Sequence, residues 1–219
     1  MAGHLLGESA PAGGCVTETR LDVLTSDDVA EVARLHREAF PGFFLTQLGE
    51  PFLRQFYRGH VEDPTAVAVV LRDATGRPLG CVVGTTEPRG FYSRLLRRRW
   101  HGFAAAAART VVTRPSAAPR LLRAVAYRGG ADSTGQGALL SSICLSPDLQ
   151  GSGQGVRLLQ GWELSAHERG AKHAFLDTDA LGNERVNAFY SHQGWELRGS
   201  YTTTQGRQMN RYVKELVRA

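Results

Sequence analysis

Residues 138–178 limit the fold more than any other part of the chain. Their pattern predicts a strand over 138–145, a helix over 154–169 and a second strand over 173–178, with a glycine-rich turn after the first strand. Two strands joined through a helix pair in parallel and need a sheet on which the helix can pack. The chain is therefore expected to be an α/β protein with a mixed central sheet flanked by helices.

The other predicted elements complete one domain around this unit. A strand over 19–24 precedes a helix that begins after Ser26-Asp27-Asp28 and ends at Pro41-Gly42. Periodicity further predicts a helix over 46–60, hairpin strands over 66–71 and 79–86, a helix over 184–193, and strands near 195–202 and 208–216. Residues 1–16 are expected to form a flexible leader and residues 17–219 a single domain.

The positive charge of the chain is concentrated in one block. The net charge is +5, but residues 88–131 contain ten arginines and no acidic residue, and the other 16 basic and 21 acidic residues give −5. The block predicts two helices, over 92–112 and 118–127. The apolar stripe expected on the first helix comprises Leu96, Trp100, Phe103 and Ala107. Residues 88–137 are therefore expected to form an Arg-rich helical insertion between the third and fourth strands.

Composition and cysteine spacing exclude several classes of protein. With 42% hydrophobic and 21% charged residues, the chain is typical of a soluble globular protein. No stretch reaches the roughly 18 apolar residues that span a bilayer, and no signal-peptide pattern is seen, so a cytoplasmic location is expected. Cys15, Cys81 and Cys144 predict reduced thiols, two of them in strands, and the histidines lack ligand spacing, so no metal is expected.

The glycine-rich turn is the part of the sequence with the clearest chemistry. Gln150-Gly151-Ser152-Gly153-Gln154-Gly155 leaves a strand and begins a helix, so successive backbone amides can converge beside the positive helix end. The turn lacks the Lys-Ser/Thr of a Walker loop and the G-x-G-x-x-G spacing of a dinucleotide site. It predicts an anion site, with a simple tight connection as the alternative.

Two motifs in this region resemble the GNAT N-acetyltransferase superfamily. The family's loop pattern matches Gln150, Gly153 and Gly155, after the strand that ends at Leu145. One helix and one strand later, the Asn-then-Phe-Tyr-then-Gly-aromatic pattern matches Asn183, Phe189-Tyr190 and Gly194-Trp195. The detailed resemblance covers about residues 138–196, and the order of elements over 17–87 agrees more loosely.

The resemblance implies a role for each matching residue. The loop, Gln150, Gly151, Ser152, Gly153, Gln154 and Gly155, would hold the CoA pyrophosphate. The preceding strand would separate from its parallel neighbour and pair with the pantetheine and the acetyl carbonyl through the backbone of Ile143 and Leu145. Asn183 would contact the pantetheine arm, Tyr190 would be the general acid, and Cys144 would pack away from the thioester.

The acid and base roles also follow from the chemistry of acyl transfer to an amine. The nucleophile must be deprotonated and the leaving thiolate must collect a proton, which a tyrosine near the sulfur can donate. Many relatives use a carboxylate on the strand before the loop, but LLSSICL contains none. Glu87 is the tentative base. The alternatives are Asp177, Asp179, Glu38, His36 or a chain of water molecules. Each of these residues also has an ordinary interpretation, as a solvated or helix-capping side chain.

The acceptor is expected between the first two helices and the sheet. Phe43, Phe44 and Phe91 would form an apolar wall and Asp177 would contact substrate, the alternative being that the phenylalanines are core. The Arg-rich segment has four interpretations: a flap packed on the body or on a second subunit of a homodimer, a site for an anionic acceptor such as a nucleotide-linked amino sugar, a membrane-docking surface, or a contact for RNA phosphates.

These observations predict an N-acyltransferase. It would move an acetyl or short acyl group from acyl-CoA to a primary amine of a small molecule by direct attack. One alternative is a transferase of the same fold that uses aminoacyl-tRNA as donor, with the Arg-rich segment binding RNA. A second alternative is a non-catalytic module that binds CoA.

Overall fold

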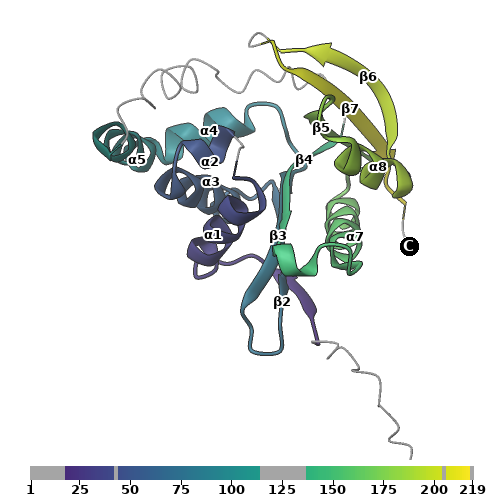
Figure 1. Cartoon of the computed structure of the whole chain (residues 1–219), viewed down its shortest axis with the longest axis horizontal. Helices are drawn as coiled ribbons and strands as arrows, with labels where there is room; N and C mark the ends of the chain where they lie inside the picture. The colour runs from purple at the N-terminus through teal and green to yellow at the C-terminus, as the bar shows by residue number, and fades with distance from the viewer. Residues whose placement is uncertain (1–17, 42–43, 114–136, 204–205, 218–219) are drawn as a thin grey trace, which may run out of the picture.

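The computed structural model describes residues 18–41, 44–113, 137–203 and 206–217 (Figure 1). The strands are β1 Arg20–Val23, β2 Ala66–Arg72, β3 Pro78–Thr85, β4 Ala138–Leu145, β5 His173–Asp179, β6 Glu196–Thr202 and β7 Gln208–Glu215. The helices are α1 Val29–Ala39, α2 Phe44–Gln47, α3 Glu50–Glu62, α4 Phe91–Arg98, α5 Trp100–Thr113, α7 Gln154–Glu168 and α8 Glu184–His192, with a 3-10 turn, η2, over Pro147–Leu149. The expected leader, helix 118–127 and Cys15 lie outside these residues.

Seven strands of the described chain form one sheet in the order β1-β2-β3-β4-β5-β7-β6. β4 and β5 are parallel, and the other neighbouring pairs are antiparallel. The predicted mixed α/β fold is therefore confirmed, and the parallel pair is the one joined through α7, as the crossover pattern requires. Cys81 and Cys144 face each other across β3 and β4 as free, buried thiols.

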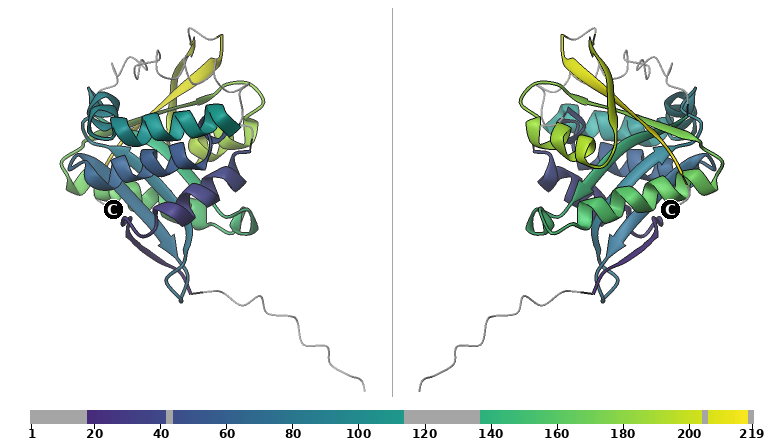
Figure 2. Two further views of the ribbon diagram at one scale, coloured as in Figure 1. Left: turned by 90° about the vertical axis from the view of Figure 1, so that its left-hand side faces the viewer. Right: turned by 90° about the vertical axis from the view of Figure 1, so that its right-hand side faces the viewer.

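Two hydrophobic clusters hold helices on opposite faces of the sheet (Figure 2). On one face, Leu158 and Trp162 of α7 pack with Val69 of β2. On the other face, Val32 of α1 and Leu53 of α3 pack with strand residues that include Val70 and Val83. Neighbouring residues of β2 belong to opposite clusters because successive side chains of a strand point to opposite faces of the sheet.

The segment after β3 differs from its sequence prediction. The helix expected over 92–112 is two helices, α4 and α5, separated at Arg99. The break changes the helical phase, so Leu95 and Phe103 are buried while Trp100 is 58% exposed. α4 packs closely on α3, since a Cβ at Gly59 would lie 2.4 Å from the Leu95 Cγ. That residues 88–137 are an insertion into the family's fold stays a prediction.

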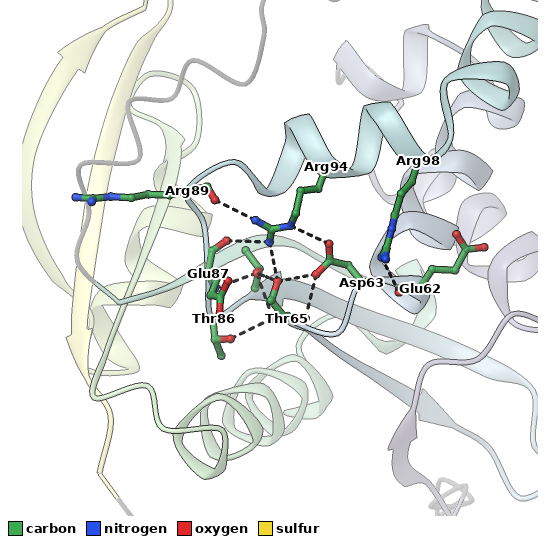
Figure 3. Close-up of polar contacts among 9 residues, drawn as sticks. Glu62, Asp63, Thr65, Thr86, Glu87, Arg89, Arg94 and Arg98 are labelled. Carbon is green, nitrogen blue, oxygen red and sulfur yellow. Dashed lines mark hydrogen bonds and ion pairs between the residues drawn. The ribbon is translucent and has the colours of Figure 1, made fainter.

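Three arginines of the Arg-rich segment are bonded to the end of α3 and the turn that leads into β2, and Figure 3 shows two of them, Arg94 and Arg98. Arg94 contacts Asp63 at 3.3 Å and donates to Thr65 Oγ1 at 3.0 Å. Arg98 donates to the Glu62 carbonyl at 3.4 Å, and Arg99 pairs with the Glu62 carboxylate. These contacts favour the flap interpretation for this part of the segment, because three of its cations are engaged within the domain.

Candidate active site

An opening between β4 and β5 is the central feature of the candidate site. The two strands pair only at Ala138 with Ala174 and at Leu139 with Phe175. Beyond these pairs β4 stays bonded to β3 as far as Leu145, and β5 stays bonded to β7. The facing edges of β4 and β5 therefore separate after Leu139, and the backbone of the second half of β4, including Ile143 and Leu145, borders the opening.

The glycine loop lies at the open end of β4, where α7 begins. Gly151 and Gly153 have φ of 81° and 82°, which favour glycine. The first bond into the helix runs from the Arg157 amide to the Gly153 carbonyl at 3.1 Å, so the preceding amides of Gly153, Gln154 and Gly155 have no partner within the helix. Among the described contacts no hydrogen bond uses these amides, and their convergence beside a helix N-terminus suits an anion.

Two arginines lie at this loop that the sequence analysis did not select. Arg185 at the start of α8 donates to Gln150 Oε1 at 3.4 Å. Arg157 in the first turns of α7 donates to the Thr19 carbonyl at 2.8 Å, and Thr19 in turn donates to Gln154 Oε1 at 3.3 Å. Both cations increase the attraction of the loop for an anion. The only sequence signal that points to Arg157 and Arg185 is that each lies within or beside one of the two family motifs.

Tyr190, the expected general acid, lies on the α7 and α8 side of the opening. Its side chain is 4% exposed and packs with Phe189, Trp195 and Tyr212 at ring distances of 5.3 to 6.0 Å. Burial raises the pKa of Tyr190 because the phenolate would lose its hydration. The hydroxyl therefore stays protonated at any pH near neutrality, which is the state that a proton donor needs.

Asn183 lies between β5 and α8. Its amide nitrogen donates to Thr178 Oγ1 at 2.8 Å and to the Asp179 carbonyl at 3.2 Å. These bonds orient the turn that leads from the open strand into α8. Asn183 therefore caps the start of α8 and Tyr190 lies near the end of the same helix, while the glycine loop lies at the end of β4.

The candidate bases are dispersed. Glu87 is exposed and lies two residues beyond the end of β3, where Thr85 pairs with Leu139. Asp177 is held by two bonds from Arg211, at 2.8 and 2.9 Å, and Asp179 is held similarly by Arg207. Glu38 pairs with Arg34 on the outer side of α1.

Of the three phenylalanines expected on the acceptor wall, only Phe91 has a described side-chain environment. Phe91 is fully buried with Leu95 and Phe103, and its ring lies 4.9 Å from the ring of His60. Its position is therefore that of a core residue. Phe44 begins α2, and Phe43 lies outside the described residues.

His36 is buried under the sheet and is bonded to a second buried side chain. Its Nδ1 lies 2.7 Å from the Tyr57 hydroxyl. Burial lowers the pKa of His36 to about 4, and burial likewise lowers the pKa of His60 to about 4. Both rings are neutral at physiological pH, and a group of such low basicity is a poor proton acceptor.

These histidines predict a loss of stability on mild acidification. The pKa of each is lower in the folded state than the usual 6.5, so their contribution is fully present above pH 6.5 and is lost as the pH falls toward 4. Between pH 7 and pH 5 we expect a loss of about 2 kcal/mol per histidine. Urea unfolding across this range measures it, and His60→Phe should remove about half of the loss. A flat profile would contradict the burial of neutral rings.

Two further properties concern the described residues only. They contain no group of three or more His, Cys, Asp or Glu side chains suited to hold a metal ion. Within the same ranges, every helix is too short or too polar to cross a bilayer.

Comparison with known proteins agrees with this geometry. The sequence pattern of the Acetyltransferase (GNAT) family matches residues 29–195, which is most of the chain. Among curated proteins, no sequence matches significantly.

Solved structures share the fold at low identity. SsHAT has a TM-score of 0.63 and 20% identity, covering 91% of this chain and 99% of its own. A GNAT-family acetyltransferase of Desulfovibrio desulfuricans has a TM-score of 0.60 and 15% identity, covering 92% and 100%. The ribosomal-protein-S18-alanine N-acetyltransferase of Escherichia coli has a TM-score of 0.52 and 15% identity, covering 92% and 96%. With the family pattern spanning both the opening and the loop, the chain belongs to the GNAT acetyltransferase family.

Proposed function

We propose that the protein is a cytoplasmic N-acyltransferase that moves an acetyl or other short acyl group from acyl-CoA to the primary amine of a small molecule. The observation that carries the proposal is the opening between β4 and β5, which leads to a loop whose amides have no partner in the described contacts. A strand edge with unused backbone groups suits the amides of a pantetheine arm. The loop suits a pyrophosphate.

The residues around the opening would each carry out a different part of acyl transfer. The loop from Gln150 to Gly155, with Arg157 and Arg185 beside it, would hold the pyrophosphate. The backbone of Ile143 and Leu145 would bind the arm and the acyl carbonyl. Acyl-CoA supplies an activated thioester, and Tyr190 would donate the proton that the departing sulfur needs. Asn183 would orient the turn beside the arm.

The shared fold does not identify the acceptor. The structural relative from Escherichia coli is named for the alanine of ribosomal protein S18, so a common fold does not specify a small-molecule acceptor. In the described part of the Arg-rich segment, Arg94, Arg98 and Arg99 are bonded to α3 or to the turn before β2, which favours a role within the domain over an RNA contact for these three residues. We therefore retain acyl-CoA as the donor.

Two measurements test this proposal. The first is the affinity of the Gly155→Val variant for acetyl-CoA, and the second is the turnover of a panel of amines by the wild-type protein. A Cβ at Gly155 would meet only Phe189, at 3.9 Å, and the φ of Gly155 is not positive, so the variant should fold normally. Its side chain would occupy the space beside the loop amides, and we expect acetyl-CoA to bind at least tenfold more weakly by calorimetry.

The matched control is Gly170→Ala at the other end of α7. Gly170 has φ of 89° and open space around it, so alanine adds backbone strain but leaves the loop unchanged. This variant should lose some thermal stability and keep its affinity for acetyl-CoA. Wild-type protein should release CoA thiol in the presence of a primary amine. Binding without thiol release from any amine would favour the non-catalytic alternative.

A further inference from the structure

The turn between β3 and α4 carries a carboxylate that has no described partner. Glu87 is exposed, and among the described residues no group is bonded to its carboxylate. Its backbone is held on both sides, because the Glu87 amide donates to Thr85 Oγ1 at 3.1 Å and the Glu87 carbonyl accepts from Arg94 at 3.5 Å. The backbone of Glu87 is therefore fixed, while its carboxylate stays open to solvent.

Arg94 of α4 holds this turn through all three nitrogens of its guanidinium (Figure 3). One nitrogen donates to the Arg89 carbonyl at 3.1 Å, and a second donates to Thr65 Oγ1 at 3.0 Å and to the Glu87 carbonyl. The third, Nε, donates to Asp63 at 3.3 Å. Burial opposes the charge of Asp63, but hydrogen bonds from Thr65 and Arg94 outweigh it and lower the pKa of Asp63. The group that anchors Arg94 is thus an anion.

Threonine side chains join the same turn to the residue before β2. Thr85 Oγ1 lies 2.9 Å from Thr65 Oγ1 and 3.1 Å from the Thr65 carbonyl oxygen, and Thr85 is fully buried. The amide and the hydroxyl of Thr86 donate to the same carbonyl, at 2.9 and 3.2 Å. Any movement of the turn would break several of these bonds together.

The turn lies beside the start of the opening between β4 and β5. Before the turn, Thr85 pairs with Leu139, the last residue of β4 that pairs with β5. After the turn, Tyr92 of α4 donates to Ser141 Oγ at 3.0 Å, two residues further along β4, where the strand gains an extra residue in its pairing with β3. Glu87 therefore belongs to a short segment that contacts β4 on both sides of the point where the opening begins.

This segment and Tyr190 lie on opposite faces of the sheet. Tyr92 packs against the cluster formed by α1, α3 and the strands, whereas Tyr190 belongs to the cluster formed with α7 (Figure 1). A thioester held in the opening would therefore have a proton donor on one face and the Glu87 turn beside the other. Transfer to an amine needs a group of each kind, because the nucleophile must lose a proton and the sulfur must gain one.

The other candidate bases are engaged or weakly basic. Asp177, Asp179 and Glu38 each form an ion pair with an arginine, which stabilises the carboxylate and makes it a weaker base. Burial lowers the pKa of His36 to about 4. Of these candidates, Glu87 is the one whose carboxylate has no cation bonded to it in the described contacts.

The charged groups next to the turn come from three elements. At the end of α3, Asp63 is bonded to Arg94 and Glu62 pairs with another arginine of the segment. The guanidinium of Arg89 extends away from Arg94 (Figure 3). At the start of β5, His173 is exposed. The acidic side chains of α3 that adjoin the turn are thus neutralised by arginines, and the carboxylate on the turn itself is not.

We propose that Glu87 is the general base for the acceptor's amine, acting through a water molecule, and that Arg94 is the positioning residue that holds Glu87 at the start of the opening. This inference rests on the proposed acyltransferase function. A carboxylate can take a proton through one water that also contacts the amine. Arg94 acts through the turn, because its guanidinium bonds the carbonyls of both Glu87 and Arg89.

The transfer step balances without a further reactant. The ammonium of the acceptor gives one proton through the water to Glu87, and the nitrogen lone pair then forms a bond to the acyl carbon. The carbon–sulfur bond breaks, and the sulfur takes a proton from Tyr190. The nitrogen releases its second proton to water, Tyr190 recovers a proton from water, and Glu87 passes its proton to solvent. The products are an amide, the CoA thiol and one proton.

The first test is Glu87→Gln, with acetyl-CoA as donor and propylamine, ethanolamine and 6-aminohexanoate as acceptors. The variant should fold normally and bind acetyl-CoA with a Kd within about twofold of wild type, because the carboxylate is exposed. At pH 7.5 we expect kcat/KM for the amine that wild type acetylates fastest to fall about 10²-fold. An alkyl amine with a pKa near 10.4 is roughly 0.1% neutral at pH 7.5 and about 11% neutral at pH 9.5, so the loss should shrink about tenfold or more at the higher pH.

The second test is Arg94→Lys, alone and combined with Glu87→Gln. Lysine keeps a cation beside Asp63, so the buried carboxylate stays paired, but it cannot donate to Thr65 and to both turn carbonyls at once. We expect kcat/KM at pH 7.5 to fall about tenfold while the Kd of acetyl-CoA stays the same. In the Glu87→Gln background the same substitution should have no further effect, because Arg94 acts only through Glu87.

The matched controls are Glu62→Gln, which removes an exposed carboxylate at the end of α3, and Arg98→Lys on α4, and both should keep wild-type kcat/KM. Wild-type kcat/KM in Glu87→Gln, or an equal loss at pH 7.5 and 9.5, would overturn the base role and leave the proposed function intact. No loss in Arg94→Lys, or an equal loss in both backgrounds, would overturn the positioning role. Acetyl-CoA binding with no acetylation of any amine would refute both the inference and the proposed function.

Discussion

Replacement of Tyr190 by phenylalanine is expected to lower kcat by about 10²- to 10⁴-fold while the Kd of acetyl-CoA stays the same. The ring packs among Phe189, Trp195 and Tyr212, so phenylalanine keeps the contacts and removes only the hydroxyl. Because burial raises the pKa of Tyr190, the wild-type hydroxyl is a donor throughout the neutral range, and its loss leaves the departing thiolate to take a proton from water. Single-turnover and steady-state rates of thiol release measure the effect.

Tyr212→Phe provides the matched control. Tyr212 lies in the same cluster, with its ring 6.0 Å from that of Tyr190, and its hydroxyl donates to Asn187 Oδ1 at 3.0 Å. Its loss should cost about 1 kcal/mol of stability and little turnover. Equal kcat values in Tyr190→Phe and wild type would exclude the general-acid role, whereas a similar fall in both variants would indicate a packing effect.

Replacement of Asp28 by alanine is expected to cause the largest loss of stability, about 3–5 kcal/mol. The Asp28 and Arg72 side chains are only 6% and 10% exposed, and they share two hydrogen bonds, at 2.6 and 2.7 Å. Asp28 also accepts bonds from the amide and hydroxyl of Thr25, which join the end of β1 to the start of α1. Alanine leaves the Arg72 charge buried beside the more exposed Asp22.

Urea unfolding at pH 7.5 measures this loss against two controls. Glu38→Ala breaks a pair on the outer surface of α1, where solvent screens the charges, and should cost less than about 1 kcal/mol. Asp28→Ala combined with Arg72→Met removes both charges and should recover part of the stability lost in Asp28→Ala. If Asp28→Ala were no more destabilising than Glu38→Ala, the buried pair would not be a stabilising feature of the fold.

The loop and its flanking elements were predictable because their signals are local. The glycines after β4 mark a turn with positive φ, and the start of α7 follows from the periodicity of its apolar residues, so the region appears where the sequence analysis expected it. The parallel pairing of β4 with β5 also followed, since a strand, a crossover helix and a second strand pair in parallel.

The Arg-rich segment shows what local sequence patterns did not predict. A continuous period predicted one helix with Trp100 in its buried stripe, but the chain breaks at Arg99 and exposes Trp100. The ten arginines left four interpretations open, and only the packed structure shows that Arg94, Arg98 and Arg99 form bonds to α3 or to the turn before β2. Phe91, expected on a substrate wall, became core because α4 turns it toward Leu95 and Phe103.

The sequence by itself determined the unit of strand, glycine loop, helix and strand, and with it the family, because backbone conformation and periodicity are properties of neighbouring residues. Only the tertiary structure decided which groups meet in the opening. Tyr92 and Ser141 are 49 positions apart, and nothing in either local pattern indicates that their hydroxyls lie 3.0 Å apart. Such contacts depend on how α4 packs on α3 and on where β4 gains its extra residue. These are consequences of close packing between distant segments, which no short stretch of sequence specifies.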